Sequence, residues 1–351
     1  MHQTDTPAKY QKVMLMSHAI EAFPFSLGDE PCIWFDDHHC HARLTAQPVA
    51  FLDALQDDLR QIALRRLTAD FPPKQLFRDL ILDDGASGGD FRVMPCVVSG
   101  PNRTTKTVKI VGSNFRRKQI PSRMTVGRAL YLDPQENFVS AEFAAFALSG
   151  ARTGACAALA RRLLGRGRIV TLYGAGPVAW YAAFYLASDK RLEYLRVIDP
   201  DDAKAQRTLA SLKEIFPSLR GECNATATIA DEAETVILAT DSAQPFFHPA
   251  MTHASLIISL GADSDEQSEL HPDWACHANL LTDLEDSACL GDLKRWKTAG
   301  LIDDTSPTDL IGLLRAPNPR KPVGRRTVFV STGSALLDNL TIHYLLERSG
   351  T

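Results

Sequence analysis

The chain has 351 residues, of which 45% are hydrophobic and 23% are charged. This composition is typical of a globular protein with a sizeable core, and the length fits two modest domains. A formal net charge of -4 excludes a general electrostatic attraction to nucleic acids or anionic membranes. No apolar run is long enough for a secretory signal or a membrane span. From the net charge and the lack of such a run, we expect no nucleic-acid or membrane partner.

The seven cysteines are scattered and contain no Cys-x-x-Cys pair. Such a pattern predicts reduced thiols rather than a disulfide framework, and hence a cytoplasmic protein. Cys156 is expected to be a small core residue, because no histidine lies nearby in the sequence to activate it. The ligand-rich run at residues 36–41 has the wrong spacing for a zinc knuckle or one helical face. We interpret it as a polar loop and expect no functional metal.

The first part of the chain predicts an α+β domain. Residues 1–30 form a loosely specified extension, and residues 32–35 predict a short strand. Apolar residues at helical spacing predict a helix over residues 49–69, which two prolines follow. Further strands are expected at residues 76–82, 91–98, 108–111 and 129–132, with hairpin loops at 85–89 and 99–102. Several short strands after one helix favour a largely antiparallel sheet.

From about residue 141, helices and strands alternate. Residues 141–164 are alanine-rich and predict a helix that ends at Gly165. Buried-type strands are expected at residues 169–173, 194–198, 235–239 and 256–260, and helices at 177–187 and 203–216. This alternation predicts a parallel, doubly wound α/β sheet. The tail predicts a strand at 326–330 and a helix at 335–347, which we expect to pack back onto the first domain.

The sharpest local signal is a GxGxxA motif that starts at Gly174, directly after the strand at residues 169–173. The first glycine permits a tight turn, and the second lets the backbone approach a pyrophosphate at the N-terminus of the next helix. Asp199 ends the following strand, at about the spacing of an acid that binds ribose hydroxyls. An acid there repels a 2′-phosphate, so the motif predicts NAD rather than NADP. The residues expected at the cofactor are Gly174, Ala175, Gly176, Pro177, Val178 and Asp199.

Four further segments accompany this motif: residues 108–111, residues 150–155, residues 260–270 and a closing Ser-Thr-Gly at 331–333 followed by Asp338. Together, and in this order, they resemble the ornithine cyclodeaminase and mu-crystallin family. Two departures stand out. Arg152-Thr153-Gly154-Ala155 replaces the family's RTAA, and Pro177-Val178 replaces the second half of a common GxGxQA pattern.

The resemblance implies a domain order. The extension (residues 1–30) is followed by a substrate-binding and dimerisation domain (31–145 with 320–351) and by a Rossmann NAD-binding domain (146–319). It also implies that Thr153, Thr240 and Gly261 join the cofactor site, and that the protein is a homodimer.

The resemblance further implies that Lys109 and Arg152 hold the substrate carboxylate and that Asp263 lies near the reacting amine. The chemistry agrees, because arginine offers a bidentate fork to a carboxylate, and an acid can stabilise an iminium or relay a proton. Asp263 and Lys109 are therefore the predicted catalytic residues. The family's first carboxylate-binding arginine follows a proline. Lys74, Arg78 and Arg92 are candidates for it here, and Arg78 is preferred.

Three functions follow from the resemblance. The first is a net NAD-dependent dehydrogenase that forms and hydrolyses an imine of a small amino acid or an N-carboxyalkyl amino acid. Residues 71–74 and 109–113 look more like the branch that makes 2,3-diaminopropionate for siderophores by oxidising an N-(amino-carboxyethyl)glutamate. The second is an ornithine-type cyclodeaminase with recycled, bound NAD. The third is a mu-crystallin-like dinucleotide-binding protein with little turnover, which the joint presence of Lys109, Arg152 and Asp263 disfavours.

Overall fold

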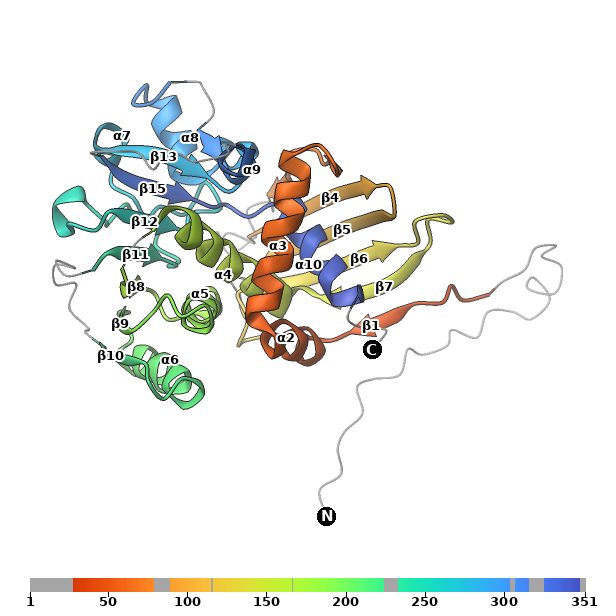
Figure 1. The fold of residues 1–351 in the computed structure, drawn as a ribbon, viewed down its shortest axis with the longest axis horizontal. Coiled ribbons are helices and arrows are strands. Elements are labelled where there is room, and N and C mark those ends of the chain that lie inside the picture. The colour runs from red at the N-terminus through yellow and green to blue at the C-terminus, as the bar shows by residue number, and fades with distance from the viewer. Residues whose placement is uncertain are drawn as a thin grey trace, which may run out of the picture. The chain divides into compact units, whose positions relative to one another are not determined.

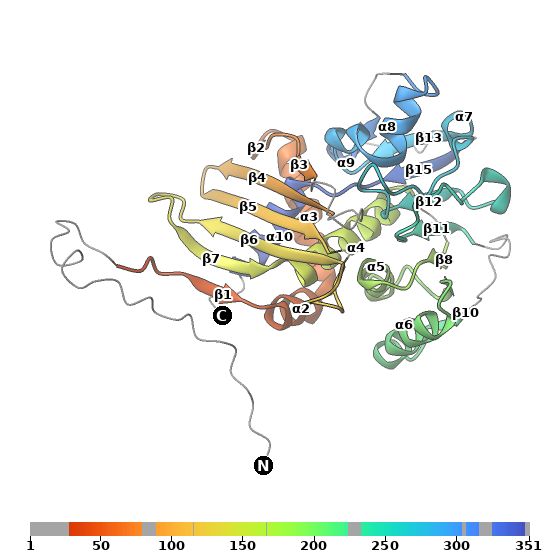
Figure 2. The ribbon, with the colours of Figure 1, turned by 180° about the vertical axis from the view of Figure 1, so that it is seen from behind.

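The computed structural model describes residues 28–78, 89–114, 116–165, 167–223, 233–303, 307–315 and 325–347. Almost all of the expected extension therefore lies outside the described residues. Residues Cys32–Thr351 form one compact unit with two sheets (Figures 1 and 2). All seven cysteines are free thiols, and Cys156 is fully buried in the core as predicted. Among the described residues, no helix combines the length and the hydropathy needed to cross a membrane.

The first sheet has seven strands in the order β1-β7-β6-β5-β4-β2, and β3 also pairs with β4. β1 runs parallel to β7, whereas the other neighbouring strands are antiparallel. The strands are β1 (Ile33–Phe35), β2 (Thr68–Asp70), β3 (Gln75–Arg78), β4 (Asp90–Gly100), β5 (Arg103–Ser113), β6 (Thr125–Leu132) and β7 (Val139–Ala144).

Helices cover one face of this sheet (Figure 1). α10 (Ala335–Glu347) packs on β4 and β5, α3 (Pro48–Ala63) packs on α10, and α2 (Asp37–Ala46) packs on β1 and β7. Side chains of β4 alternate between the two faces, so that Met94, Cys96 and Val98 are buried. The fully buried Asn339 of α10 donates hydrogen bonds to the carbonyl oxygens of Cys96 and Thr105, which fixes the helix on the strands.

The second sheet has eight parallel strands in the order β10-β9-β8-β11-β12-β15-β13-β14. The chain starts this sheet at β8 and places β9 on one side and β11 on the other. The carboxyl ends of β8 and β11 therefore flank the topological switch point, where open α/β sheets bind their ligands. The strands are β8 (Ile169–Tyr173), β9 (Tyr194–Ile198), β10 (Arg220–Cys223), β11 (Thr235–Leu238), β12 (Leu256–Ser259), β13 (Ala278–Thr282), β14 (Thr308–Asp309) and β15 (Arg326–Val330).

α4 (Ala145–Leu164) connects the two sheets and packs against α5 (Pro177–Ser188). The two helices approach closely at Gly154, where a Cβ atom would lie 2.6 Å from the backbone nitrogen of Ala182. This contact gives a physical reason for glycine at this position. The remaining helices are α6 (Asp202–Ile215), α7 (Trp274–His277), α8 (Gly291–Thr298), α9 (Leu310–Arg315), and the 3-10 turns η1 (Pro249–Met251) and η2 (Glu285–Cys289).

Two predictions for the first part of the chain were wrong. The polar run at residues 36–41 is the start of α2 rather than a loop, because Asp36 caps this helix by accepting a hydrogen bond from His39 N at 2.8 Å. The helix expected over residues 49–69 ends at Ala63, and residues 68–70 pair with β4 as β2. The hairpin at 99–102 is confirmed, whereas residues 79–88, which include most of the other expected loop, lie outside the described residues.

In the second part, the strands and helices of the doubly wound sheet are confirmed to within a residue or two. The helix expected from residue 141 was wrong in its first turn, because residues 139–144 pair between β1 and β6 as β7. The expected boundary at residue 320 placed the whole tail with the first sheet. β15 instead lies between β12 and β13 in the second sheet, and of the two tail elements it is α10 that packs on the first.

The α4–α5 contact gives a prediction for stability. The change Gly154→Ala forces the two helices apart, because the new methyl group meets backbone rather than a movable side chain. We expect the free energy of unfolding to fall by about 1–3 kcal/mol, although alanine favours an isolated helix by about 1 kcal/mol. Urea unfolding followed by circular dichroism measures the change. A variant as stable as the wild type, or more stable, contradicts the packing described here.

Candidate active site

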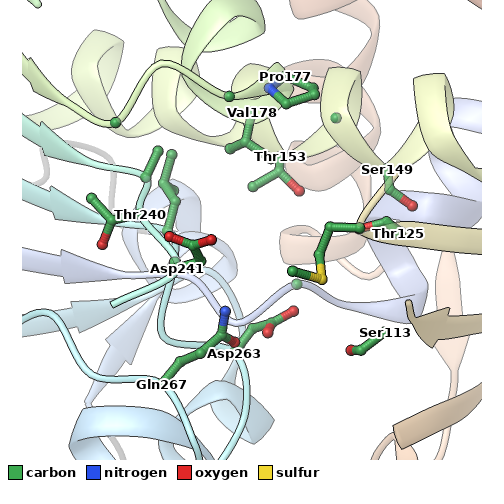
Figure 3. A pocket seen from close by; sticks show the side chains of 18 of the residues that line it. Ser113, Thr125, Ser149, Thr153, Pro177, Val178, Thr240, Asp241, Asp263 and Gln267 are labelled. Carbon is green, nitrogen blue, oxygen red and sulfur yellow. The ribbon is translucent and has the colours of Figure 1, made fainter. Parts of the chain in front are cut away.

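A cavity of about 830 Å³ opens at the carboxyl ends of β8, β11 and β12 and extends to the ends of β4, β5 and β6. In Figure 3, Pro177, Val178 and Thr240 lie on one side of it, Ser113 and Thr125 lie on the other, and Asp263 projects between them. The side formed by the loops of the second sheet is called the dinucleotide side below, and the opposite side the substrate side. Every predicted cofactor residue lines the cavity: Thr153, Gly174, Ala175, Gly176, Pro177, Val178, Asp199, Thr240 and Gly261.

The glycine loop has the geometry that a dinucleotide needs. Gly174 adopts a φ of 96°, and a Cβ atom there would lie 2.3 Å from the carbonyl oxygen of Ala239. A Cβ atom on Gly176 would meet nothing within 4 Å, so the backbone is open to the cavity at this point. α5 begins directly after Gly176 without a side-chain cap. Its first N–H groups can therefore bind a pyrophosphate.

Asp199 joins this loop to the end of β9. Its Oδ2 accepts a hydrogen bond from Ala175 N at 2.8 Å, and its Oδ1 accepts one from Asp201 N at 2.9 Å. The Nζ of Lys204 lies 3.6 Å from Oδ2. The carboxylate thus holds the turn in shape and also lines the cavity. Its contact with a ribose stays a prediction.

The buried Glu269 holds the other two loops of the dinucleotide side, a role that the sequence did not reveal. One carboxylate oxygen accepts hydrogen bonds from Thr240 N at 2.7 Å and Thr240 Oγ1 at 2.9 Å. The other accepts from Ser259 Oγ at 2.7 Å and Gly261 N at 2.9 Å. Burial raises the pKa of Glu269, although these donors oppose the rise. The residue fixes the ends of β11 and β12 relative to each other.

Lys109 and Arg152 meet at one buried carboxylate on the substrate side. The Nζ of Lys109 lies 2.6 Å from Oδ2 of Asp338, and Nε of Arg152 donates to Oδ1 of Asp338 at 3.0 Å. The arginine reaches this place because Gly333, at a φ of 75°, has no side chain: a Cβ atom there would lie 2.4 Å from Nη1 of Arg152. Burial lowers the pKa of Lys109 to about 7, and Asp338 opposes this effect.

Asp263 faces the cavity at the junction of the two sides, with 35% of its side chain exposed. Its Oδ2 accepts a hydrogen bond from Nη1 of Arg92 at 2.5 Å, and in the orientation that satisfies its amide, Gln267 donates to Oδ1 at 2.8 Å. Burial would raise the pKa of Asp263, but the charges of Arg92 and Lys74 lower it below its ordinary value. The carboxylate is therefore held as an anion that can face a developing cation.

The three candidates for a further carboxylate-binding residue, Lys74, Arg92 and Arg78, lie at different places in the structure. Lys74 lies in the cavity wall, where its Nζ donates to the carbonyl oxygen of Thr332 at 2.5 Å. Burial lowers its pKa to about 8. Arg92 also lines the cavity, but it is bound by Asp90 at 3.0 Å as well as by Asp263. The preferred candidate, Arg78, ends β3, and its side chain lies outside what the structure describes.

One group of side chains outside the cavity has the composition of a metal site, namely His248, His271 and Asp273. Its hydrogen bonds argue against that role. Nδ1 of His248 accepts from Ala250 N at 3.0 Å, so in the neutral ring Nε2 carries the proton and donates to Asp273, 2.8 Å away. Nδ1 of His271 accepts from Asp273 N at 3.2 Å. A metal ion at this point would have to displace these bonds.

Comparison with known proteins identifies the family of the chain. The family model of the ornithine cyclodeaminase/mu-crystallin family matches residues 44–350. An L-lysine cyclodeaminase of Streptomyces rapamycinicus is 30% identical over 272 residues, which cover 74% of this chain and 77% of that protein.

Two solved structures share the fold at lower identity. Thermococcus litoralis Δ1-pyrroline-2-carboxylate reductase, in complex with NADH and L-proline, is similar with a TM-score of 0.80 and 17% identity, over 90% of this chain and 97% of that chain. An archaeal alanine dehydrogenase dimer with bound NAD is similar with a TM-score of 0.75 and 19% identity, over 91% of this chain and 96% of that chain.

The buried lysines make ligand binding depend on pH. Lys109 and Lys74 lose their protons as the pH rises through about 7 and about 8, so the site loses positive charge. We expect the affinity for a simple carboxylate such as pyruvate to fall about tenfold between pH 6 and pH 9, as measured by calorimetry. The change Lys74→Arg keeps one charge over this range, so the fall should be smaller. An affinity that is independent of pH in the wild type would show that neither lysine contacts the carboxylate.

Proposed function

Because the chain belongs to the ornithine cyclodeaminase/mu-crystallin family, we propose that it is an NAD-dependent oxidoreductase that acts at the amino-bearing α-carbon of an amino acid. The observation that carries the proposal is the position of Asp263. This carboxylate lies in one cavity with an open dinucleotide loop on one side and the Lys109–Asp338–Arg152 cluster on the other. A hydride acceptor, an acid and a carboxylate-binding site are the three parts that the reaction needs.

NAD is the proposed cofactor. The positive φ of Gly174, the open space at Gly176 and the uncapped start of α5 fit a dinucleotide's pyrophosphate. Asp199 would face the ribose, where its charge disfavours the 2′-phosphate of NADP. When bound, NAD supplies the acceptor for a hydride. The reductase from Thermococcus litoralis and the archaeal dehydrogenase, which share the fold, hold NADH and NAD respectively.

The protein's own residues bind and orient the substrate and stabilise the cation that forms from it. Lys109 and Arg152, with Lys74 at the same wall, hold the α-carboxylate of the substrate. The α C–H bond breaks with loss of a hydride, and the lone pair of the amine nitrogen forms a C=N double bond. Asp263 stabilises the resulting iminium cation and takes up the proton that the nitrogen releases. Addition of water to the carbon and cleavage of the C–N bond then give a 2-oxo acid and a free amine; the reverse sequence is reductive amination.

A cyclodeaminase is the second candidate, because the relative from Streptomyces rapamycinicus is an L-lysine cyclodeaminase. In that reaction a second amine of the same substrate attacks the imine, ammonia leaves to give a cyclic imine, and the hydride is returned to that imine, so that no NADH accumulates. Synthesis of 2,3-diaminopropionate stays a prediction of the sequence, and N-carboxyalkyl amino acids belong in the substrate panel for that reason. A protein that only binds dinucleotide is disfavoured, because Lys109, Arg152 and Asp263 all line the same cavity.

We also propose that the protein is a homodimer joined through the first sheet. The face opposite α10 is apolar and open: Trp34 is 46% exposed, Phe91 is 42% exposed and Ile110 is 44% exposed. Phe91 stacks on Phe77 of β3, and Ile110 lies opposite Val93 in the β4–β5 ladder, so these apolar side chains are neighbours, whereas the guanidinium of Arg128 lies over the ring of Trp34. Exposed apolar surface of this kind marks protein interfaces. The archaeal alanine dehydrogenase that shares the fold is a dimer.

The reaction can be tested by absorbance at 340 nm with NAD or NADP and a panel of amino acids. We expect NADH to accumulate, and we expect Asp263→Asn to lower kcat about 100-fold, because the neutral amide stabilises a cation poorly. Affinity for NADH should change little. Asp265→Asn is a matched control, since this nearby acid binds Lys294 outside the cavity. Ammonia release from ornithine or lysine without NADH would favour the cyclodeaminase. Full activity of Asp263→Asn would contradict the role of the acid.

The dimer has its own test. The change Ile110→Glu places a charge in the centre of the open face, so we expect it to convert the dimer to a monomer in sedimentation velocity at micromolar concentration. Leu301→Glu is the matched control, because Leu301 is similarly exposed but lies beyond α8, away from the first sheet. A wild-type chain that is monomeric, or an Ile110→Glu variant that stays dimeric, rules out this interface.

A further inference from the structure

The substrate side of the cavity is unevenly charged. Among the described residues that line it, five are cations: Lys74, Arg92, Lys109, Arg117 and Arg152. Asp263, at the junction of the two sides, is the lining carboxylate that contacts one of these cations, Arg92; the other acids that line the cavity, Asp199, Asp201 and Asp241, lie on the loops after β9 and β11. Behind the wall, Asp338 and Asp90 offset part of this charge. A ligand on this side therefore meets more positive than negative charge.

The charge of the lining determines which class of amino acid the substrate side of the cavity can bind. The α-carboxylate uses the Lys109–Asp338–Arg152 cluster, and the reacting amine uses Asp263. A diamino acid would bring a second cation, for which the described lining of the substrate side offers no further carboxylate. A substrate with a second carboxylate would instead meet a cation that the first carboxylate leaves unused.

A suitable place for it lies on the segment between β5 and β6. Arg117, Ser122 and Thr125 line the cavity there, and together they offer a guanidinium and two hydroxyl groups. The side chain of Asn114 holds the segment: its Nδ2 donates to the carbonyl oxygens of Ile120 and Arg123, both at 2.9 Å.

The backbone of Arg117 is constrained in addition. Its φ is 47°, a left-handed conformation that is uncommon for arginine, and its N–H donates to Oδ1 of Asn114 at 3.1 Å. Residues held in such sparsely populated conformations cluster at ligand-binding sites. Arg117 is exposed and lines the cavity, and its hydrogen bond to Asn114 holds its backbone there.

We propose that the substrate is a dicarboxylic amino or imino acid, whose second carboxylate is bound by Arg117 and by the hydroxyl groups of Ser122 and Thr125. This inference rests on the proposed function and specifies its substrate class. It favours a net dehydrogenase, because a dicarboxylic acid with a single amine lacks the second amine that cyclodeamination requires.

Binding to the NADH-loaded protein tests the proposal without turnover. We expect oxaloacetate, a dicarboxylic 2-oxo acid, to bind at least tenfold more tightly than pyruvate when Kd is measured by NADH fluorescence. In Arg117→Gln this advantage should fall to about twofold or less. Arg116→Gln removes the same charge from an exposed neighbour that does not line the cavity, and it should keep the advantage. Equal binding of the two ligands in the wild type overturns the proposal, as does an advantage that survives in Arg117→Gln.

Turnover separates this proposal from the proposed function. Formation of NADH at 340 nm is compared for a dicarboxylic, a monocarboxylic and a diamino acid, with the same three proteins. A dicarboxylic substrate with at least tenfold higher kcat/KM, and loss of this preference in Arg117→Gln, supports both. A monocarboxylic or diamino substrate that is oxidised best overturns the substrate class and leaves the oxidoreductase intact. If oxaloacetate binds more tightly than pyruvate but no amino acid gives NADH, the result has the opposite meaning. The proposed site for a second carboxylate is then supported, and the proposed reaction is contradicted.

Discussion

The site depends on one buried carboxylate. Asp338 neutralises Lys109 from β5 and Arg152 from α4, so three elements that are distant in the sequence meet at a single point. Two cations this deeply buried would repel each other and destabilise the fold without a shared anion. With it, and below the pKa of Lys109, they carry one net positive charge that is preorganised for a ligand's carboxylate. The proposed carboxylate-binding site and the docking of α10 on the first sheet thus depend on the same ion pairs.

The dinucleotide side could be predicted from the sequence because its signals are local. The strand, the Gly174 turn and the start of α5 follow one another within a single βα unit, and Asp199 ends the next strand. Each residue type there is required by the local backbone conformation, so a short stretch of sequence is enough to recognise it. The role of Glu269 was not predicted, because it depends on long-range contacts. Its hydrogen bonds to Thr240 and Gly261 join loops that are brought together only by the fold of the sheet.

The substrate side was predicted less completely, because long-range pairing decides its structure. Residues 139–144 contain alanines that suggest a helix, but β1 and β6 on either side hold them as a strand. Lys109 and Arg152 were named from the resemblance, whereas Asp338 was only quoted as part of a motif and its ion pairs were not foreseen. Lys74 was one candidate among three, and only the fold places its ammonium group at Thr332.

The chain passes between the two sheets twice, through α4 and through the segment from β15 to α10. The first crossing carries Arg152, and the second carries Thr332, Gly333 and, at the start of α10, Asp338. A rotation of one sheet against the other would have to bend the backbone at these two crossings. Arg152 and Asp338 lie at these crossings, where such a rotation would displace them least. A rotation that widened the cavity would therefore leave the Lys109–Asp338–Arg152 cluster assembled.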